Sequence, residues 1–265
     1  MTRTVNSSLT AEILSPTTVE LQVAVAGGAA TQESLQVTLA GQDVAVTELA
    51  TEAGGRLHVV RCGAGTLQVD YRATVEAGGG PVEVQPLDEA TYLRPSRYAE
   101  SDRLAAVAAA ELGGTRDKGE LVRTVAAWVG QRLRYVSGSS RVTDGAADTL
   151  LAGAGVCRDY AHLTTALLRA RDVPARLVSV YAPGLAPMDF HAVVEALVDG
   201  RWQTVDATLL APRPSMVRIA TGRDAADTAF MSSYGGALRL DRIRVDAVVD
   251  GDLPTDDLDT AVQLG

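Results

Sequence analysis

The sequence predicts an α+β protein in which a small all-β module precedes a core of helices and strands. Three observations support this fold class. Residues 1 to about 85 alternate β-type segments with Gly-rich turns, residues 101–171 carry helical patterns, and residues 175–249 return to strand patterns. A run of strands followed by helices is typical of α+β folds or of separate domains. A chain of 265 residues can bury one large core or two modest ones.

The first 85 residues predict a small antiparallel β-sandwich. Several of its segments alternate apolar and polar residues with period 2, the pattern of a sheet with one solvated face. Gly-rich turns separate these segments. The expected strands are 18–25, 35–39, 44–46, 57–60 and 66–73. No residue pattern in this module indicates chemistry.

A Gly- and Pro-rich segment at 78–96 predicts a linker to the helical region. An Ala-rich helix is expected over 103–112, because Ser or Asp precedes it and two glycines follow it. An amphipathic helix is expected over 117–135. A further apolar helix starts at Cys157 and ends near Arg171, before Val-Pro. We therefore expect a core at 86–250 and an acidic tail at 251–265.

The Asp199-Gly200 pair predicts a tight hairpin, because Asp-Gly between two apolar runs favours a type I′ turn. With these two turn residues, His191 and Asp206 become diagonal neighbours on one face, about 7–8 Å apart at Cα. A slip of one residue would place them on opposite faces. The strands expected here are 175–181, 190–198, 201–206 and 239–249.

The charge distribution argues against nucleic-acid or anionic-membrane partners, because the net charge is −9. Part of this excess lies in the five aspartates between residues 250 and 259. They loosely resemble a calcium loop but lack its 12-residue ligand spacing, so we expect a solvated tail. We see no membrane span or signal peptide, and the two distant cysteines fit a reduced, cytoplasmic setting.

Cys157 is the candidate nucleophile. It follows Gly155 at the start of the apolar helix, where the positive end of the helix dipole favours a thiolate. The same position leaves backbone N–H groups that could bind an oxyanion. The alternative is a buried Cys that packs as a small hydrophobic residue. Cys62, at a strand end in the β module, fits that alternative better.

His191 is the candidate base and Asp206 its orienting carboxylate, which gives the order Cys, His, Asp of a thiol triad. His162 is turned away from Cys157 on the same helix, and we expect it to pack or cap. Glu195, on the same strand face as His191, is the reserve carboxylate. Zinc is the weaker alternative for these residues, because structural zinc normally takes four ligands with short spacings; we predict no metal and no cofactor.

Three segments in order, 155–163, 188–195 and 200–208, closely resemble the bacterial transglutaminase-like family. The resemblance covers about residues 92–229, and the β module resembles one that precedes the core in many bacterial members. It implies a papain-like transglutaminase core, helices packed on an antiparallel sheet, with a Cys-His-Asp triad. Arg158 stands where animal transglutaminases have Trp, and no calcium site like theirs is evident.

The resemblance implies an acyl-transfer enzyme acting on a peptide or protein substrate. Its triad would be Cys157, His191 and Asp206, with Arg158, Asp189 and Tyr160 as candidate substrate contacts. A solvated Arg158 is the alternative for that residue. Hydrolysis of a peptide or isopeptide bond is favoured over transfer to an amine, because no acceptor-amine site is evident. A non-catalytic binding protein that keeps the fold is the alternative from another class.

Overall fold

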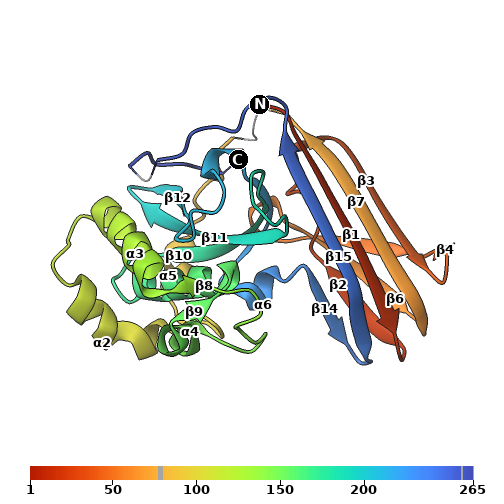
Figure 1. Cartoon of the computed structure of the whole chain (residues 1–265), viewed down its shortest axis with the longest axis horizontal. Helices are drawn as coiled ribbons and strands as arrows, with labels where there is room; N and C mark the ends of the chain where they lie inside the picture. Colours follow the sequence, from red (N-terminus) through yellow and green to blue (C-terminus); the bar gives the residue numbers. More distant parts are fainter. Residues whose placement is uncertain (77–79, 258, 265) are drawn as a thin grey trace.

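Two antiparallel sheets face each other at one end of the molecule and form a β-sandwich (Figure 1). The computed structural model describes residues 1–76, 80–257 and 259–264. One sheet has the strand order β15-β1-β7-β3-β4 and the other β14-β2-β6-β5. The strands are β1 (Arg3–Ile13), β2 (Thr17–Leu21), β3 (Ala30–Leu39), β4 (Gln42–Asp43), β5 (Val46–Ala50), β6 (Arg56–Cys62), β7 (Gly65–Val75), β14 (Met231–Tyr234) and β15 (Leu238–Val249), with the 3-10 turn η1 (Glu52–Gly54) before β6.

Both ends of the chain build this sandwich. Strand β15 pairs along the whole of β1, from Arg3 opposite Val249 to Ile13 opposite Leu238, and β14 pairs with β2. The division expected from sequence placed these C-terminal strands in the core, and it did not identify β1 at all. Every second residue of β1 is buried, but two of these buried positions hold the polar residues Arg3 and Ser7. They interrupt the apolar alternation on which strand recognition depends.

The second module packs helices against a four-stranded antiparallel sheet of order β12-β11-β10-β13. Helix α5 lies against β10 and β11, and α2, α3 and α4 surround it (Figure 1). Almost every residue of α5 after its first turn is buried, so it is the central helix of the core. The elements are α1 (Asp88–Tyr92), α2 (Ser101–Leu112), α3 (Lys118–Arg132), β8 (Arg134–Tyr135), α4 (Ala146–Ala152), β9 (Ala154–Gly155), α5 (Cys157–Arg169), β10 (Ala175–Tyr181), β11 (Phe190–Val198), β12 (Arg201–Val205), η2 (Arg213–Ser215), β13 (Val217–Gly222) and α6 (Ala225–Thr228).

The hairpin register expected from Asp199-Gly200 is confirmed. Val198 pairs with Arg201, and the ladder continues to Val194 opposite Val205. Both turn residues have positive φ, 49° and 73°, as a type I′ turn requires. The register places the residue after β12, Asp206, on the same side of the sheet as His191.

The two modules share a hydrophobic core. Tyr181 and Ile219, from the core strands β10 and β13, pack into the interior of the sandwich. The buried Tyr181 hydroxyl donates to the Val23 carbonyl (2.7 Å) and lies 2.9 Å from Ser7 Oγ. These apolar and polar contacts hold the sandwich at a fixed position beside the core.

Four of the five aspartates expected to be solvated, Asp250, Asp252, Asp257 and Asp259, are exposed, but other residues of the C-terminal segment pack against the core. The Arg213 guanidinium forms a two-point ion pair with Asp256, with N–O distances of 2.8 and 2.9 Å. Further along, the Val262 carbonyl accepts from the Thr204 N–H (2.7 Å) and the Leu264 side chain is buried. Acidic composition suggested solvation, but the arginine and the strand edge of β12 supply partners.

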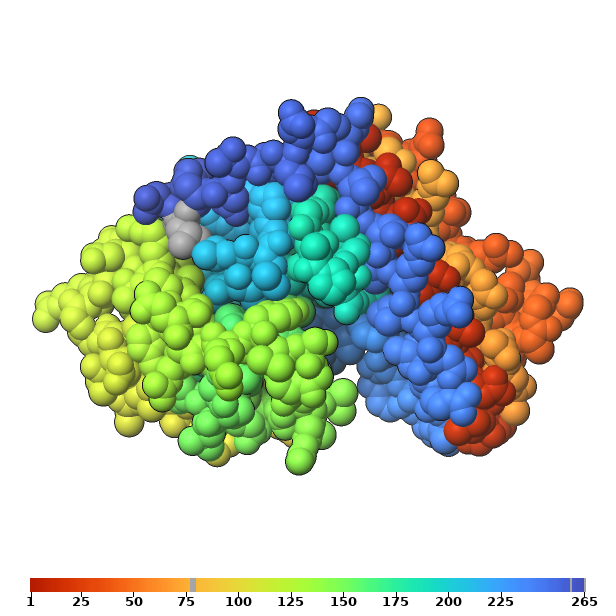
Figure 2. Space-filling view, in the orientation of Figure 1, coloured from red at the N-terminus to blue at the C-terminus, as the bar shows by residue number. Residues whose placement is uncertain are grey.

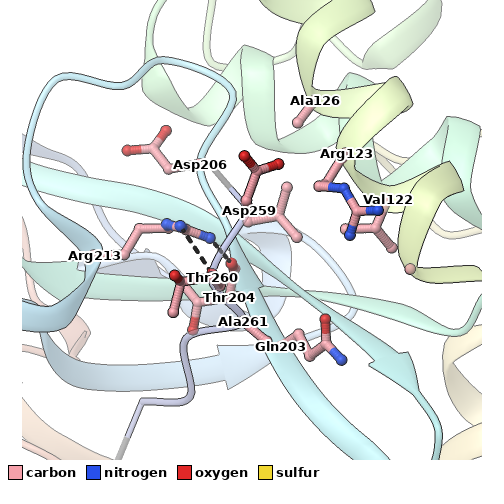
Figure 3. Close-up of a pocket in the computed structure, with 12 residues that line it drawn as sticks. Val122, Arg123, Ala126, Gln203, Thr204, Asp206, Arg213, Asp259, Thr260 and Ala261 are labelled. Atoms are coloured by element: carbon pink, nitrogen blue, oxygen red, sulfur yellow. Dashed lines mark hydrogen bonds between the residues drawn. The ribbon is translucent and has the colours of Figure 1, made fainter. Parts of the chain in front are cut away.

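The packed segment also closes the side of the core behind Asp206. Figure 3 shows Asp206, Arg213 and Asp259 around a small cavity of about 40 Å³ between α3, β12 and the C-terminal segment. Its dashed lines mark the Arg213 hydrogen bonds to the carbonyls of Thr204 (2.9 Å) and Thr260 (3.2 Å).

Among the described residues, no helix combines the length and apolar character needed to cross a bilayer.

Candidate active site

Cys157 is the first residue of α5, and its side chain is only half-buried. The helix start is fixed by Asp159, whose buried carboxylate accepts from the Val156 N–H at 2.8 Å. Gly155 makes room for that cap, because a Cβ there would lie 2.6 Å from the Asp159 Cβ. The sulfur therefore sits at the positive end of a buried helix and remains reachable from outside. Cys62, by contrast, is buried in the sandwich.

His191 and Asp206 form a buried hydrogen-bonded pair. The His191 Nε2 lies 2.8 Å from the Asp206 Oδ2. Burial works against a charged imidazole, but the Asp206 carboxylate and the Cys157 thiol outweigh it and raise the pKa of His191 to about 10. The other ring nitrogen, Nδ1, has no hydrogen-bond partner within the usual distance among the described residues. This leaves Nδ1 as the nitrogen available to the thiol.

Asp206 is held by an Asx-type turn as well as by His191. Its Oδ1 accepts from the Thr208 N–H at 2.8 Å and from the Thr208 hydroxyl at 2.7 Å. Burial alone would raise the pKa of Asp206, but the hydrogen bonds and the charge of His191 lower it below its usual value. The carboxylate is thus ionised and fixed in orientation. Thr208 was not identified from sequence, although Asp-x-Thr is a recognisable turn pattern.

Glu195, the reserve carboxylate, is occupied elsewhere. It lies buried between Arg176 and Arg218, at 2.7 and 2.5 Å from their nitrogens. The Arg176 guanidinium also stacks over the Trp202 ring, 3.8 Å from its centroid. Glu195 therefore holds β10, β11 and β13 together, which leaves Asp206 as the carboxylate on His191.

His162 packs away from the thiol, as the helix geometry predicts. Its ring is fully buried and stacks on Tyr98 with a centroid separation of 5.2 Å. Its Nε2 accepts from the Ala225 N–H at 3.2 Å. Burial lowers its pKa to about 3, so the ring is neutral. It fixes α6 against α5 rather than serving as a base.

Tyr135 is a site residue that the sequence reasoning missed. Parallel pairing of β8 with β9 places Tyr135 opposite Gly155, two residues before Cys157. Burial and the adjacent Cys157 side chain raise the pKa of Tyr135 to about 12, while the nearby backbone N–H of Cys157 opposes that rise. The phenol therefore lies beside the N–H group expected to bind an oxyanion. No local pattern marks it, because β8 is only two residues long.

Tyr160, expected as a substrate contact, is instead buried and supports Tyr135. Its hydroxyl donates to the Leu133 carbonyl at 2.9 Å, just before β8. Its ring lies against that of Tyr135, with centroids 5.9 Å apart. A Tyr four residues into a buried helix faces the interior, and this orientation keeps it from the cleft.

Arg158 and Asp189 line the cleft. The Arg158 guanidinium donates to the Ser140 hydroxyl (3.0 Å) and the Arg141 carbonyl (2.8 Å), so it also holds the loop before α4. Asp189 accepts from the Phe190 N–H at 2.7 Å, and burial raises the pKa of its carboxyl. These are the two oppositely charged side chains beside Cys157.

The cleft is a cavity of about 630 Å³ between the core and the sandwich. Figure 2 shows the surface hollowed where the green core meets the blue C-terminal strands. Cys157 and His191 lie on its core wall, and β14 forms the opposite wall. No cluster of three or more His, Cys, Asp or Glu that could hold a metal occurs in residues 1–76, 80–257 and 259–264.

Comparison with known proteins agrees with this architecture. The family model described as "Transglutaminase-like superfamily" matches residues 106–207. A crystal structure titled "Putative Cysteine Protease", from Cytophaga hutchinsonii, is 33% identical, with a TM-score of 0.89 over 98% of this chain and 96% of that one. An uncharacterised protein of Mycobacterium leprae is 28% identical over 163 residues, 56% of this chain and 57% of its own length. The matched region thus spans little more than half of that curated relative.

Proposed function

The chain belongs to the transglutaminase-like superfamily, and we propose from its site that it is a cysteine-dependent acyl-transfer enzyme acting on amide bonds. The observation that carries the proposal is the buried His191–Asp206 pair with Nδ1 left available beside a half-buried Cys157. The similarity to a protein titled as a cysteine protease supports the same reaction class.

In the proposed reaction, the Cys157 thiolate attacks the amide carbonyl while His191 is protonated. The raised pKa of His191 favours this charged form, and Asp206 keeps the imidazole oriented and stabilises its charge. The C–S bond forms and the carbonyl oxygen becomes an oxyanion. In this proposal the Cys157 N–H and the Tyr135 hydroxyl, which lies near it, donate to the oxyanion.

Collapse of this intermediate breaks the C–N bond, and His191 gives its proton to the leaving amine. The product is a thioester on Cys157. Water then attacks the thioester with His191 as base, the C–S bond breaks, and the carboxylic acid leaves. We favour water over an amine as acceptor because the charged side chains on the cleft wall, Arg158 and Asp189, do not by themselves form a dedicated amine site.

Acylation by p-nitrophenyl acetate tests this proposal without knowledge of the natural substrate. We expect a burst of nitrophenolate and a mass increase of one acetyl group on the peptide containing Cys157. Cys157→Ala should abolish both, whereas Cys62→Ala should change neither. Adding a primary alkylamine then reports the acceptor, since saturable faster turnover with an amide product, absent from Cys157→Ala, would identify amine transfer. Equal, slow acetylation of Cys62 and Cys157 would contradict catalysis and favour a binding protein.

A further inference from the structure

Strand β14 is an edge strand whose only neighbour in its sheet is β2. Figure 1 shows it on the side of the sandwich that faces the core. An edge strand carries a row of N–H and C=O groups that can pair with another extended chain.

The register decides which residues face outward. The Gln22 N–H donates to the Phe230 carbonyl at 3.0 Å, and Ser232 lies opposite Glu20 further along the same ladder. Because the direction of the backbone groups alternates along a strand, Phe230 and Ser232 bond toward β2. Met231 and Ser233 then present their N–H and C=O groups to the open edge. No backbone partner for this edge occurs among the described residues.

This open edge borders the cleft that holds the thiol. Met231, Ser232 and Tyr234 line the same cavity as Cys157 and His191. The floor between them is apolar, because Phe190 of β11 stacks on Phe230 with ring centroids 5.3 Å apart. A chain paired to β14 would thus run along the cleft with the nucleophile on its other side.

We infer that β14 is the substrate-binding strand: an extended peptide adds to its free edge and is held there for attack by Cys157. The inference rests on the proposed function and deepens it by naming the substrate class. Main-chain pairing at Met231 and Ser233 would supply affinity largely independent of the peptide's sequence. A paired strand would lie about 4.8 Å from β14.

The cavity lining also indicates which peptide side chains fit. Alternate residues of a paired strand point to the same side, so every second side chain faces the aromatic floor. That floor contains Leu177, Phe190, Ile219 and Phe230, and the charged groups stand beside the thiol instead. An uncharged segment with apolar residues at alternate positions therefore matches the cleft.

The test compares two electrophiles that alkylate the same sulfur. Acetyl-Leu-Val-Ala chloromethyl ketone carries a peptide backbone, and iodoacetamide carries none; in each case the Cys157 sulfur displaces the halide. Ser233→Pro removes one outward N–H without breaking the ladder to β2. Ala50→Pro is the matched control, because β5 is the opposite edge of the same sheet and Ala50 also lies on its outward register.

We expect Ser233→Pro to slow inactivation by the peptide ketone about five- to tenfold, the effect of losing one hydrogen bond. Iodoacetamide labelling should stay within twofold, and Ala50→Pro should match the wild type with both reagents. Unchanged peptide reactivity in Ser233→Pro would overturn the role of the edge while leaving the proposed function intact. Cys157 labelling by iodoacetamide no faster than that of Cys62 would instead contradict the proposed function itself.

A second measurement needs no variant and covers the case in which Ser233→Pro does not fold. The same peptide ketone with N-methyl groups on its Leu, Val and Ala amides has no N–H group left to donate to β14. Wild-type protein should react with it about five- to tenfold more slowly than with the parent ketone. Equal rates for the two ketones would overturn the inference.

Discussion

The His191 Nε2 lies 2.8 Å from the Asp206 Oδ2, and both side chains are almost completely buried. A carboxylate in such a position needs a partner, and here imidazole and Thr208 provide it. The pairing also fixes the tautomer and leaves Nδ1 for the thiol. In the proposed reaction, the reactivity of Cys157 therefore depends on Asp206, which is 49 positions away in the chain and acts through His191.

Asp206→Asn should slow alkylation of Cys157 by iodoacetamide at pH 6 by at least about tenfold. The amide cannot stabilise a protonated His191, so the charge that favours the thiolate is lost. Glu33→Gln is the control, because it breaks the ion pair with Arg56 between β3 and β6 of the sandwich, and neither strand lines the cleft. It should lower the melting temperature without changing the labelling rate. Normal labelling in Asp206→Asn would show that Asp206 does not act on His191.

Tyr135→Phe should separate alkylation from acylation. Loss of one oxyanion donor typically costs about 10²–10³ in turnover, so the acetylation burst with p-nitrophenyl acetate should fall by that order. Iodoacetamide labelling forms no oxyanion and should change little. Tyr160→Phe is the comparison, because its hydroxyl bonds only the Leu133 carbonyl. A parallel loss of both reactions in Tyr135→Phe would mean that the phenol positions Cys157 instead.

Because His162 is buried in its neutral form, we expect the folded protein to lose stability in acid. Its folded pKa is lowered to about 3, whereas an unfolded His titrates near 6.5. The unfolded chain therefore binds the extra proton first, and the stability present above pH 6.5 is lost as pH falls toward 3, by up to about 4–5 kcal/mol. His162→Gln removes this titration. Urea unfolding at pH 7.0 and 4.5 should show a smaller difference in the variant, and an unchanged difference would contradict the assignment.

Glu195→Gln should destabilise the fold strongly, because it leaves two buried arginines without their shared counter-charge. Breaking a buried ion pair by removing one partner costs about 3–5 kcal/mol. Asp246→Asn is the control: Asp246 is half exposed beside the exposed Arg244, and such pairs contribute about 0–1 kcal/mol. Chemical denaturation measures both. A small effect at Glu195 would show that the arginines find other partners.

The sequence predicts the triad because its members lie in strong local patterns. The Asp199-Gly200 turn fixes the register of His191 and Asp206, and Gly155 with Asp159 marks the start of the Cys157 helix. Features made by distant pairing were missed. Strand β1 has polar residues at two of its buried positions, β8 is too short for a pattern, and Arg213 pairs with Asp256 across 43 residues. Local periodicity carries no information about such contacts.

The sequence suggests that Arg158 contacts the substrate, whereas the structure shows it bonded to the loop before α4. Substituting Arg158 can decide between these two roles. A cation at the first turn of α5 opposes the helix dipole, so removing it should not weaken the helix. Its guanidinium also anchors Ser140 and Arg141 at the cleft mouth. If Arg158 contacts the substrate, Arg158→Ala should reduce the apparent affinity for the peptide ketone by about 1–3 kcal/mol. The rate of iodoacetamide labelling and the melting temperature should stay unchanged. Arg158→Lys, which keeps the charge, should recover part of that loss. If Arg158→Ala instead melts earlier while peptide reactivity stays at the wild-type level, Arg158 serves only to hold the loop.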